Sequence, residues 1–176
     1  MPESSPGPET EYGRELLLLR HGHAVPHGSV EPDFDRPLDA RGQSDTAWIA
    51  RWAVDARAVP DFVVASPAQR ARETAEGFCH AAGLSTEGIR WRERIYDSRV
   101  SDLLAVLAEV PTEPRRVMLV GHNPGFELVA GLLAHADPHR VRLATATLAR
   151  IRMPADWGEL NAGDGEMIEV VKPPRR

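Results

Sequence analysis

The sequence has little of several features on which specialised proteins depend. It contains a single cysteine, Cys79, among 176 residues, which excludes an internal disulfide and a thiolate-rich metal site such as a zinc finger. The longest purely aliphatic run, Leu16–Leu19, is far too short to span a bilayer. The first residues, MPESSPGPETEYG, lack the basic start and apolar stretch of a secretory signal. We therefore expect a soluble, cytoplasmic protein that does not associate with membranes.

The sequence also lacks an excess of positive charge. Lys and Arg total 21 residues against 26 Asp and Glu, so the formal net charge is −5 and the sequence pI is about 5.8. A nucleic-acid-binding domain would show a basic excess or a basic stripe, and this class of partner is therefore excluded. Lys172 is the only lysine, but the preference for arginine runs along the whole chain and carries no functional weight by itself.

The remaining composition is that of an ordinary globular domain. Hydrophobic residues make up 42% of the chain and charged residues 27%, and the length suffices for one domain with its own core. Residues 1–13 and 173–176 are rich in residues that cannot pack, so we expect them to be disordered tails. No linker or repeat lies between them, which predicts a single domain over residues 14–172, with a monomer as the default state.

Strand and helix patterns alternate along this domain. The predicted strands are Glu15–Arg20, Asp61–Ser66, Ile89–Arg92, Arg115–Gly121, Ala146–Met153 and Met167–Lys172. The predicted helices run from the cap Asp39 to about Ala58, and over Pro67–Ala82, Ser101–Val110 and Pro124–Ala134. The turn-rich segment NAGDG predicts a hairpin between the last two strands. The pattern indicates an α/β fold: a three-layer αβα sandwich with a mostly parallel central sheet, helices on both faces and a C-terminal antiparallel hairpin.

Apolar residues at helical spacing predict which face each helix buries. The predicted stripes are Trp48, Trp52 and Ala56 in the first helix; Ala71, Ala75, Phe78 and Ala82 in the second; Leu103, Val106, Leu107 and Val110 in the third; and Phe126, Val129, Ala130 and Leu133 in the fourth.

Polar motifs follow three of the predicted strands. They are RHGHA from Arg20, SPAQRARET from Ser66 and GHNPG from Gly121. Since ligands bind beyond the carboxyl ends of parallel strands, we expect these motifs to meet at one edge of the sheet. Ser66 and Asn123 each precede a proline, a pattern typical of a helix N-cap and first turn. Both helices would then direct free backbone N–H groups at this edge, where they attract anions.

The residue types at this edge suit a phosphoryl group. A neutral imidazole is a competent nucleophile toward phosphorus, and nearby guanidinium groups lower its pKa so that it stays neutral near pH 7. The guanidinium groups of Arg20 and Arg70 would also neutralise the oxygens as charge builds in the transition state. Gly22 would let the backbone approach the phosphate closely. The leaving group needs a proton, so we expect a carboxylic acid at the rim.

Taken in order, LLLLRHGHA, RPLDARG, SPAQRARETAE and VGHNPG resemble the histidine phosphatase superfamily, which has the phosphoglycerate-mutase-like fold. The short chain is similar to the compact SixA-type branch of phosphohistidine phosphatases, and the resemblance covers most of residues 15–133. It implies that His21 is the nucleophile that becomes phosphorylated. Arg20, Arg70 and His122 match the residues with which the family holds the phosphoryl group.

Other positions match the family less closely. A stretch that resembles Glu-Arg-x-Tyr places Glu93 where mutase-like members carry the general acid, with Asp97 as the alternative. His23 stands where many members have an acidic residue, and it either lines the pocket or only packs. Asn123 is a further pocket candidate, and Arg36 is interpreted as a structural residue near the pocket mouth.

The resemblance implies a phosphatase that works through a covalent phosphohistidine and needs no metal or organic cofactor. The expected partner is a phosphorylated substrate, a phosphohistidine-bearing signalling protein, and a small phosphomonoester is the alternative. A metal hydrolase using His21 and His23 is less well supported, because no later ligand set completes its site and the chain is too short for an eight-stranded barrel. A phospholigand-binding module would need no nucleophile. A mutase would need a long inserted segment, for which the chain lacks room.

Overall fold

The computed structural model describes residues 13–137, 141–154 and 156–174. Within these ranges it contains a six-stranded sheet in the order β3-β2-β4-β1-β5-β6. The strands are β1 Arg14–Arg20, β2 Phe62–Ala65, β3 Arg90–Trp91, β4 Arg116–Gly121, β5 Leu148–Met153 and β6 Glu166–Val171. Strands β3, β2, β4 and β1 pair in parallel, whereas β5 and β6 are antiparallel to their neighbours. The predicted mostly parallel sheet with a C-terminal antiparallel pair is confirmed.

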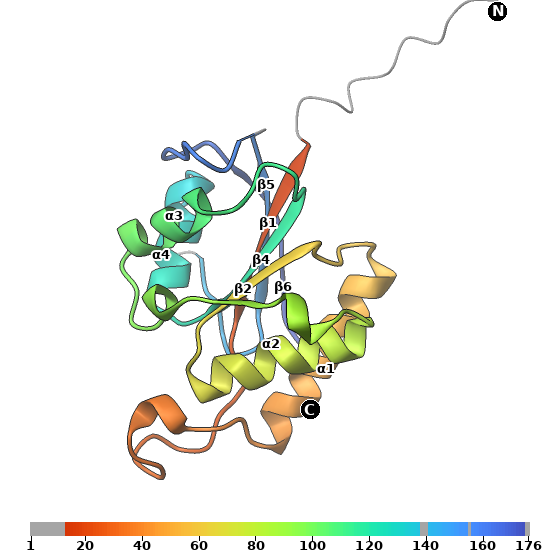
Figure 1. Cartoon of the computed structure of the whole chain (residues 1–176), viewed down its shortest axis with the longest axis vertical. Helices are drawn as coiled ribbons and strands as arrows, with labels where there is room; N and C mark the ends of the chain where they lie inside the picture. Colours follow the sequence, from red (N-terminus) through yellow and green to blue (C-terminus); the bar gives the residue numbers. More distant parts are fainter. Residues whose placement is uncertain (1–12, 138–140, 155, 175–176) are drawn as a thin grey trace, which may run out of the picture.

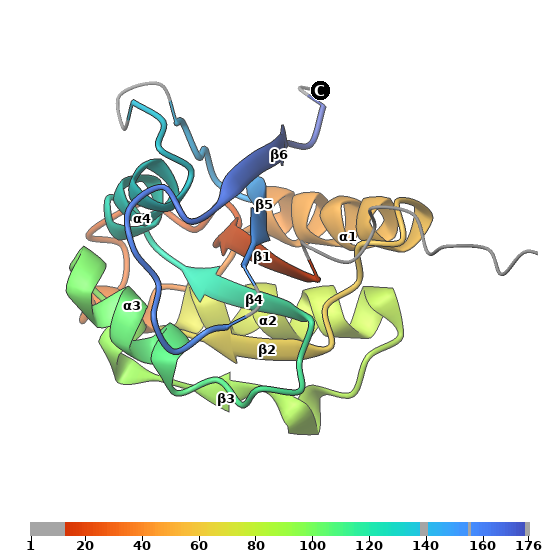
Figure 2. The same cartoon turned by 90° about the horizontal axis from the view of Figure 1, so that it is seen from above.

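Helices cover both faces of this sheet (Figures 1 and 2). In the described ranges the α-helices are α1 Ala40–Asp55, α2 Gln69–Ala82, α3 Val100–Ala108 and α4 Gly125–Leu133, and the short 3-10 turns are η1 Asp33–Asp35, η2 Thr86–Gly88 and η3 Glu93–Ile95. Helices α1 and α2 lie on one face, and α3 and α4 lie on the other, which is the predicted αβα sandwich. None of the described helices is long and apolar enough to cross a membrane.

The leucine run of β1 explains why the sheet has two covered faces. Leu16 and Leu18 are fully buried in the core beneath α3 and α4, whereas Leu17 and Leu19 are fully buried in the core beneath α1 and α2. Successive side chains of a strand point to opposite faces, so a strand covered on both sides must be apolar at every position. This central strand therefore lacks the polar–apolar alternation of a half-exposed strand.

The predicted helix faces are confirmed in α3 and α4, and in α2 apart from the half-buried Ala82. In α1 the predicted stripe lies at the border of the buried face rather than at its centre. The buried residues of α1 include Ile49, Ala50 and Ala53, whereas Trp48 and Trp52 are only partly buried. Helix α1 packs against both the sheet and α2, and the alanines allow this close contact while the large indoles remain at its border.

The predicted tails cannot be compared in full, because residues 1–12 and 175–176 lie outside the described ranges. Strands and helices extend from residue 14 to residue 171, and the predicted single domain over residues 14–172 stays a prediction.

The first turn of α1 packs directly against the backbone that follows β1. Asp39 caps this helix, since its carboxylate accepts a hydrogen bond of 2.9 Å from the backbone N–H of Gly42. A Cβ atom at Gly42 would overlap the carbonyl oxygen of His23, and one at Gly22 would lie 2.8 Å from the carbonyl oxygen of Gly42. This contact between two glycines holds the segment after β1 against the helix.

The space around Gly42 and around Gly77 predicts opposite effects on stability when each is replaced by alanine. We expect Gly42→Ala to lower the free energy of unfolding by about 2 kcal/mol or more, because the added methyl group overlaps backbone. Gly77→Ala is the matched control, since its Cβ would lie at an ordinary 3.5 Å from Thr46 Cγ2 in the interior of α2. We expect this second change to stabilise by about 0.5–1 kcal/mol. Urea unfolding measures both, and equal effects would contradict the packing argument.

Candidate active site

Three polar motifs meet where β1, β2 and β4 end side by side. His21 follows β1, Ser66 follows β2, and His122 follows β4. The ring centroids of His21 and His122 lie 5.2 Å apart. The charges of Arg20 and Arg70 act on both rings. The structure thus brings these two arginines and two histidines together at one edge of the sheet.

His21 is buried, with only 7% of its surface exposed. Its Nδ1–H donates a hydrogen bond of 2.8 Å to the carbonyl oxygen of Gly22, which leaves the lone pair on Nε2. Burial lowers the pKa of His21 to about 3, and the charges of Arg70, Arg20 and Arg36 add to this effect against the opposing hydrogen bond. The ring is therefore neutral near pH 7 and presents a nucleophilic nitrogen.

His122 is held by a serine. The hydroxyl of Ser66 lies 2.8 Å from His122 Nε2 and also accepts a hydrogen bond from the backbone N–H of Ala68. The hydroxyl proton is then free to be donated to Nε2, which places the proton of the neutral imidazole on Nδ1. Burial lowers the pKa of His122 to about 3, with further lowering by His21. The ring can therefore offer its Nδ1–H as a hydrogen-bond donor.

Each arginine of the site is anchored at the end of its guanidinium group. Arg20 Nη1 donates to the carbonyl oxygen of Leu143 at 2.9 Å. Arg70 Nη1 donates to the backbone carbonyl of Asp33 at 2.9 Å, and its Nη2 forms an ion pair of 3.1 Å with the carboxylate of the same residue. These contacts leave the Nε–H group of each arginine available.

Three buried nitrogen atoms of this site have no hydrogen-bond partner among the described residues: Arg20 Nε, Arg70 Nε and His122 Nδ1. A buried donor without a partner costs about 1–3 kcal/mol. Burial and the charge of Arg70 also lower the pKa of Arg20, although the carboxylate of Glu127 opposes this shift. An oxyanion would satisfy all three donors and relieve the repulsion between the guanidinium groups. The arrangement can therefore hold a tetrahedral anion beside the nucleophilic nitrogen of His21.

The backbone of Gly22 and the side chain of His23 both contact other parts of the protein. The N–H of Gly22 donates to Thr74 Oγ1 at 2.9 Å, and its close approach is to α1. Packing against this helix is enough to require a glycine here, and its approach to a phosphate stays a prediction. His23 Nδ1 lies 2.5 Å from the carboxylate of Asp39, which caps α1. The His23 side chain is partly exposed and held by this carboxylate, and the two roles considered for it stay open.

The two helix-cap predictions at this edge were wrong. Helix α2 begins at Gln69 and α4 at Gly125, one or two residues later than predicted. The side chain of Ser66 instead contacts the second histidine, and that of Asn123 donates to the carbonyl oxygen of Leu143 at 2.8 Å. Ser66 keeps a local hydrogen bond from the N–H of Ala68, but neither side chain caps its helix, and both form tertiary hydrogen bonds.

The segment expected to supply the general acid lies at the mouth of the site. Glu93 and Asp97 are exposed, and their side chains form no hydrogen bond or ion pair in the described part of the chain. Tyr96 lies between them in sequence and packs edge-on against His122, with 5.4 Å between ring centroids. Its hydroxyl lies 3.5 Å from a carboxylate oxygen of Asp33. The aromatic residue, rather than either predicted acid, contacts the histidine.

Comparison with known proteins is consistent with this geometry. The family model described as histidine phosphatase superfamily (branch 1) matches residues 16–97. A solved protein of Nakamurella multipartitia, described as a phosphohistidine phosphatase SixA, is 30% identical; the match covers 91% of this chain and 96% of that one, with a TM-score of 0.73. This chain belongs to the histidine phosphatase superfamily.

Two further relatives of this superfamily member are similar over most of the chain. A protein of Agrobacterium tumefaciens described as a phosphohistidine phosphatase SixA is 28% identical, with 93% of this chain and 100% of that one covered and a TM-score of 0.76. An uncharacterised chloroplastic protein of Arabidopsis thaliana is 28% identical, over 82% of this chain and 69% of its own. The compact SixA-type members are thus its structural neighbours.

Four contributions to the site of this histidine phosphatase superfamily member were missed by the sequence analysis: the Ser66 hydroxyl, the Asp33 carboxylate, the Tyr96 ring and the Leu143 carbonyl. A backbone carbonyl has no sequence signal. Asp33 had a weak sequence signal, since it stands three residues before Arg36. In the structure the two form an ion pair of 3.0 Å. Arg36 also donates to a backbone carbonyl, in keeping with the structural role expected for it.

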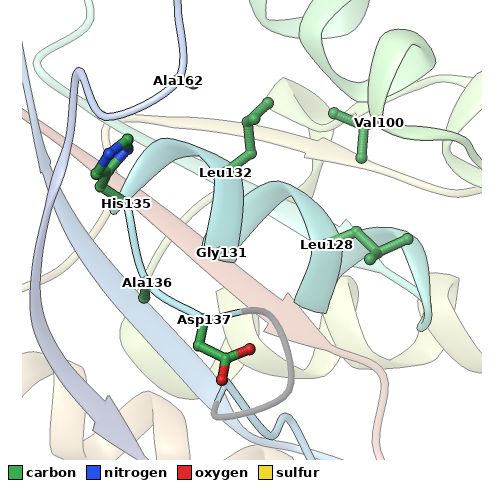
Figure 3. A pocket seen from close by; sticks show the side chains of 8 residues that line it. All are labelled: Val100, Leu128, Gly131, Leu132, His135, Ala136, Asp137 and Ala162. Atoms are coloured by element: carbon green, nitrogen blue, oxygen red, sulfur yellow. The ribbon is translucent and has the colours of Figure 1, made fainter.

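Other parts of the molecule contribute little to this site. In the described ranges, no three His, Cys, Asp or Glu side chains form a group that could hold a metal ion. An apolar hollow of about 630 Å³ lies along α4 and the residues that follow it (Figure 3). Val100, Leu128 and Leu132 line it together with His135, and it contains none of the predicted site residues.

The two buried histidines predict a loss of stability in acid. Their pKa is lowered from 6.5 to about 3 in the folded protein, so below pH 6.5 the unfolded chain binds more protons and stability falls as the pH falls toward 3. Between pH 7 and pH 5 we expect each to cost about 2 kcal/mol. Urea unfolding at both pH values should therefore show a loss about 2 kcal/mol smaller in His21→Ala than in wild type.

The exposed His80 of α2 provides the control for this measurement. His80→Ala should keep the wild-type loss between the two pH values. Equal losses in all three proteins would contradict a buried, neutral His21.

Proposed function

We propose that this protein is a phosphatase that transfers a phosphoryl group to His21 and then to water, and that its substrate is phosphohistidine on a protein. One observation carries the proposal: among the described residues, Nε of Arg20, Nε of Arg70 and Nδ1 of His122 have no partner and are buried beside a neutral His21. These donors suit the oxygens of a phosphoryl group in line with the nucleophilic nitrogen.

In the first step, Nε2 of His21 attacks phosphorus, and the bond between phosphorus and the leaving group breaks. The hydrogen bond from Nδ1–H to Gly22 keeps the lone pair on the attacking nitrogen. Arg20, Arg70 and His122 donate to the non-bridging oxygens while charge is redistributed in the transition state. The product is a phosphohistidine on the enzyme.

In the second step, water attacks this phosphorus, the bond to His21 Nε2 breaks, and inorganic phosphate leaves. A carboxylate, which is ionised from the start or has given its proton to a leaving group that needs one, accepts a proton from the water. Glu93 is our preferred residue and Asp97 the alternative. Both side chains are exposed, and both belong to the segment that places Tyr96 against His122.

The proton balance favours phosphohistidine as the substrate. An imidazole leaving group can depart with a proton already on its other ring nitrogen, whereas an alkoxide must receive one. Asp33 cannot supply a proton: burial opposes its ionisation, but His27, Arg70 and Arg36 lower its pKa to about 2. The SixA-type neighbours are named for the same substrate class. A small phosphomonoester is the alternative, for which Glu93 or Asp97, both exposed, would supply the proton.

Trapping the intermediate tests the reaction. Wild-type enzyme is incubated with a ³²P-labelled phosphohistidine protein and then separated from it under denaturing conditions. We expect label on the enzyme itself that is stable in alkali and lost in acid, as a phosphoramidate should be. The label should be absent from His21→Ala and present in His80→Ala, whose exposed side chain is the matched control. Comparable turnover by His21→Ala would reject the scheme, and binding of the substrate without turnover by wild type would indicate a phospholigand-binding module.

Leaving-group dependence tests the substrate class and the acid together. We expect wild-type kcat/KM to be higher for a phosphohistidine peptide than for the matching phosphoserine peptide. Glu93→Gln should lower kcat/KM, which reports the step that releases the leaving group, by about 100-fold or more for phosphoserine, the usual contribution of a general acid, and much less for phosphohistidine. If Asp97→Asn has the larger effect, the acid is Asp97. Preference for phosphoserine in wild type would favour the phosphomonoester alternative.

A further inference from the structure

We infer that Asp33 is a positioning residue that sets the orientation of the Arg70 guanidinium for binding of the phosphoryl group. The inference rests on the proposed function, because it assigns Arg70 to the phosphoryl oxygens. It concerns a residue in the short turn η1, 37 positions before the arginine that it contacts.

The clamp on Arg70 uses one edge of its guanidinium group. The backbone carbonyl of Asp33 accepts from Nη1 at 2.9 Å, and its carboxylate pairs with Nη2 at 3.1 Å. The edge formed by Nε–H and the second hydrogen of Nη2 stays free, and Nε is buried without a partner among the described residues. Arginine binds oxyanions through two parallel N–H groups along one edge. Since Asp33 occupies one edge, the other is left for the phosphoryl group.

The carboxylate is itself held in place from several directions. One of its oxygens pairs with Arg36 Nε at 3.0 Å and with His27 Nδ1 at 2.9 Å. The hydroxyl of Tyr96 lies 3.5 Å from the other oxygen. Arg36 in turn donates to the carbonyl oxygen of Val25. These contacts tie Asp33 to the loop after β1 and to the mouth of the site, so it provides a fixed reference for a long side chain.

The two arginines of the site differ in the charge of their anchors. Arg20 is held by the neutral carbonyl of Leu143, whereas Arg70 is held by a carboxylate as well as a carbonyl. A free arginine side chain loses about 2 kcal/mol of rotamer entropy when it is ordered. A charged anchor keeps the Arg70 side chain ordered before the phosphoryl group binds, and it offsets the repulsion from Arg20. Removing the carboxylate should therefore loosen Arg70 specifically.

A double-mutant cycle between Asp33 and Arg70 tests this inference. We expect Asp33→Ala to lower kcat/KM by about 30-fold, within the range for a displaced binding group, and to weaken orthovanadate binding similarly. In the Arg70→Ala background the same change should have an effect of less than about 3-fold, because the group it positions is absent. Asp33→Asn should fall between, since its amide oxygen still accepts a hydrogen bond but the charge is lost.

Asp35→Ala is the matched control, because Asp35 lies in the same turn and is exposed; it should retain wild-type activity and vanadate affinity. Thermal unfolding verifies that each variant is folded, and Asp33→Asn replaces Asp33→Ala in the cycle if the alanine variant does not fold. Equal effects in the two backgrounds, or no effect in the folded variant, would overturn the inference. Orthovanadate binding by calorimetry does not depend on turnover, so it separates this result from failure of wild type to form phosphorylated His21.

Discussion

The structure depends on holding two guanidinium groups close together next to two neutral imidazoles. Arg20 and Arg70 repel each other, and burial increases the cost of their charges. Acceptors behind each group, the carbonyl of Leu143 and the Asp33 carboxylate, offset this cost. The same positive charges contribute to keeping His21 neutral. One electrostatic arrangement therefore attracts an anion and preserves the nucleophile that would react with it.

The sheet supplies the geometry for this arrangement. Parallel neighbours β1, β4 and β2 end at the same edge, and in the register of β1 with β4 Arg20 lies opposite Gly121, one residue before the second histidine. Leucines buried on both faces fix β1, and the glycine contact with α1 fixes the segment that follows it. The distance between the two histidines is therefore set by the packed backbone of β1 and β4.

Much of the fold was predictable because its signals are local. The unbroken apolar run of Leu16–Leu19 identified a strand covered on both faces, and the motifs that carry His21 and His122 followed predicted strands. The errors occurred where one side chain could serve two purposes. Ser66 and Asn123 are good helix caps, but in the fold they meet groups from distant segments. The indoles of α1 pack only partly against the core, because a stripe pattern does not show which part of it meets a neighbouring helix.

The sequence by itself determined the succession of strands and helices along the chain, the three motifs at the strand ends and the chemistry that their residue types suit. These features follow from periodicity and from functional groups next to one another in the chain. Only the tertiary structure decided how those groups are oriented: Arg20 finds Leu143 across 123 positions, and Arg70 finds Asp33 across 37. Such pairings depend on where the folded backbone places each acceptor, and no local pattern encodes that placement.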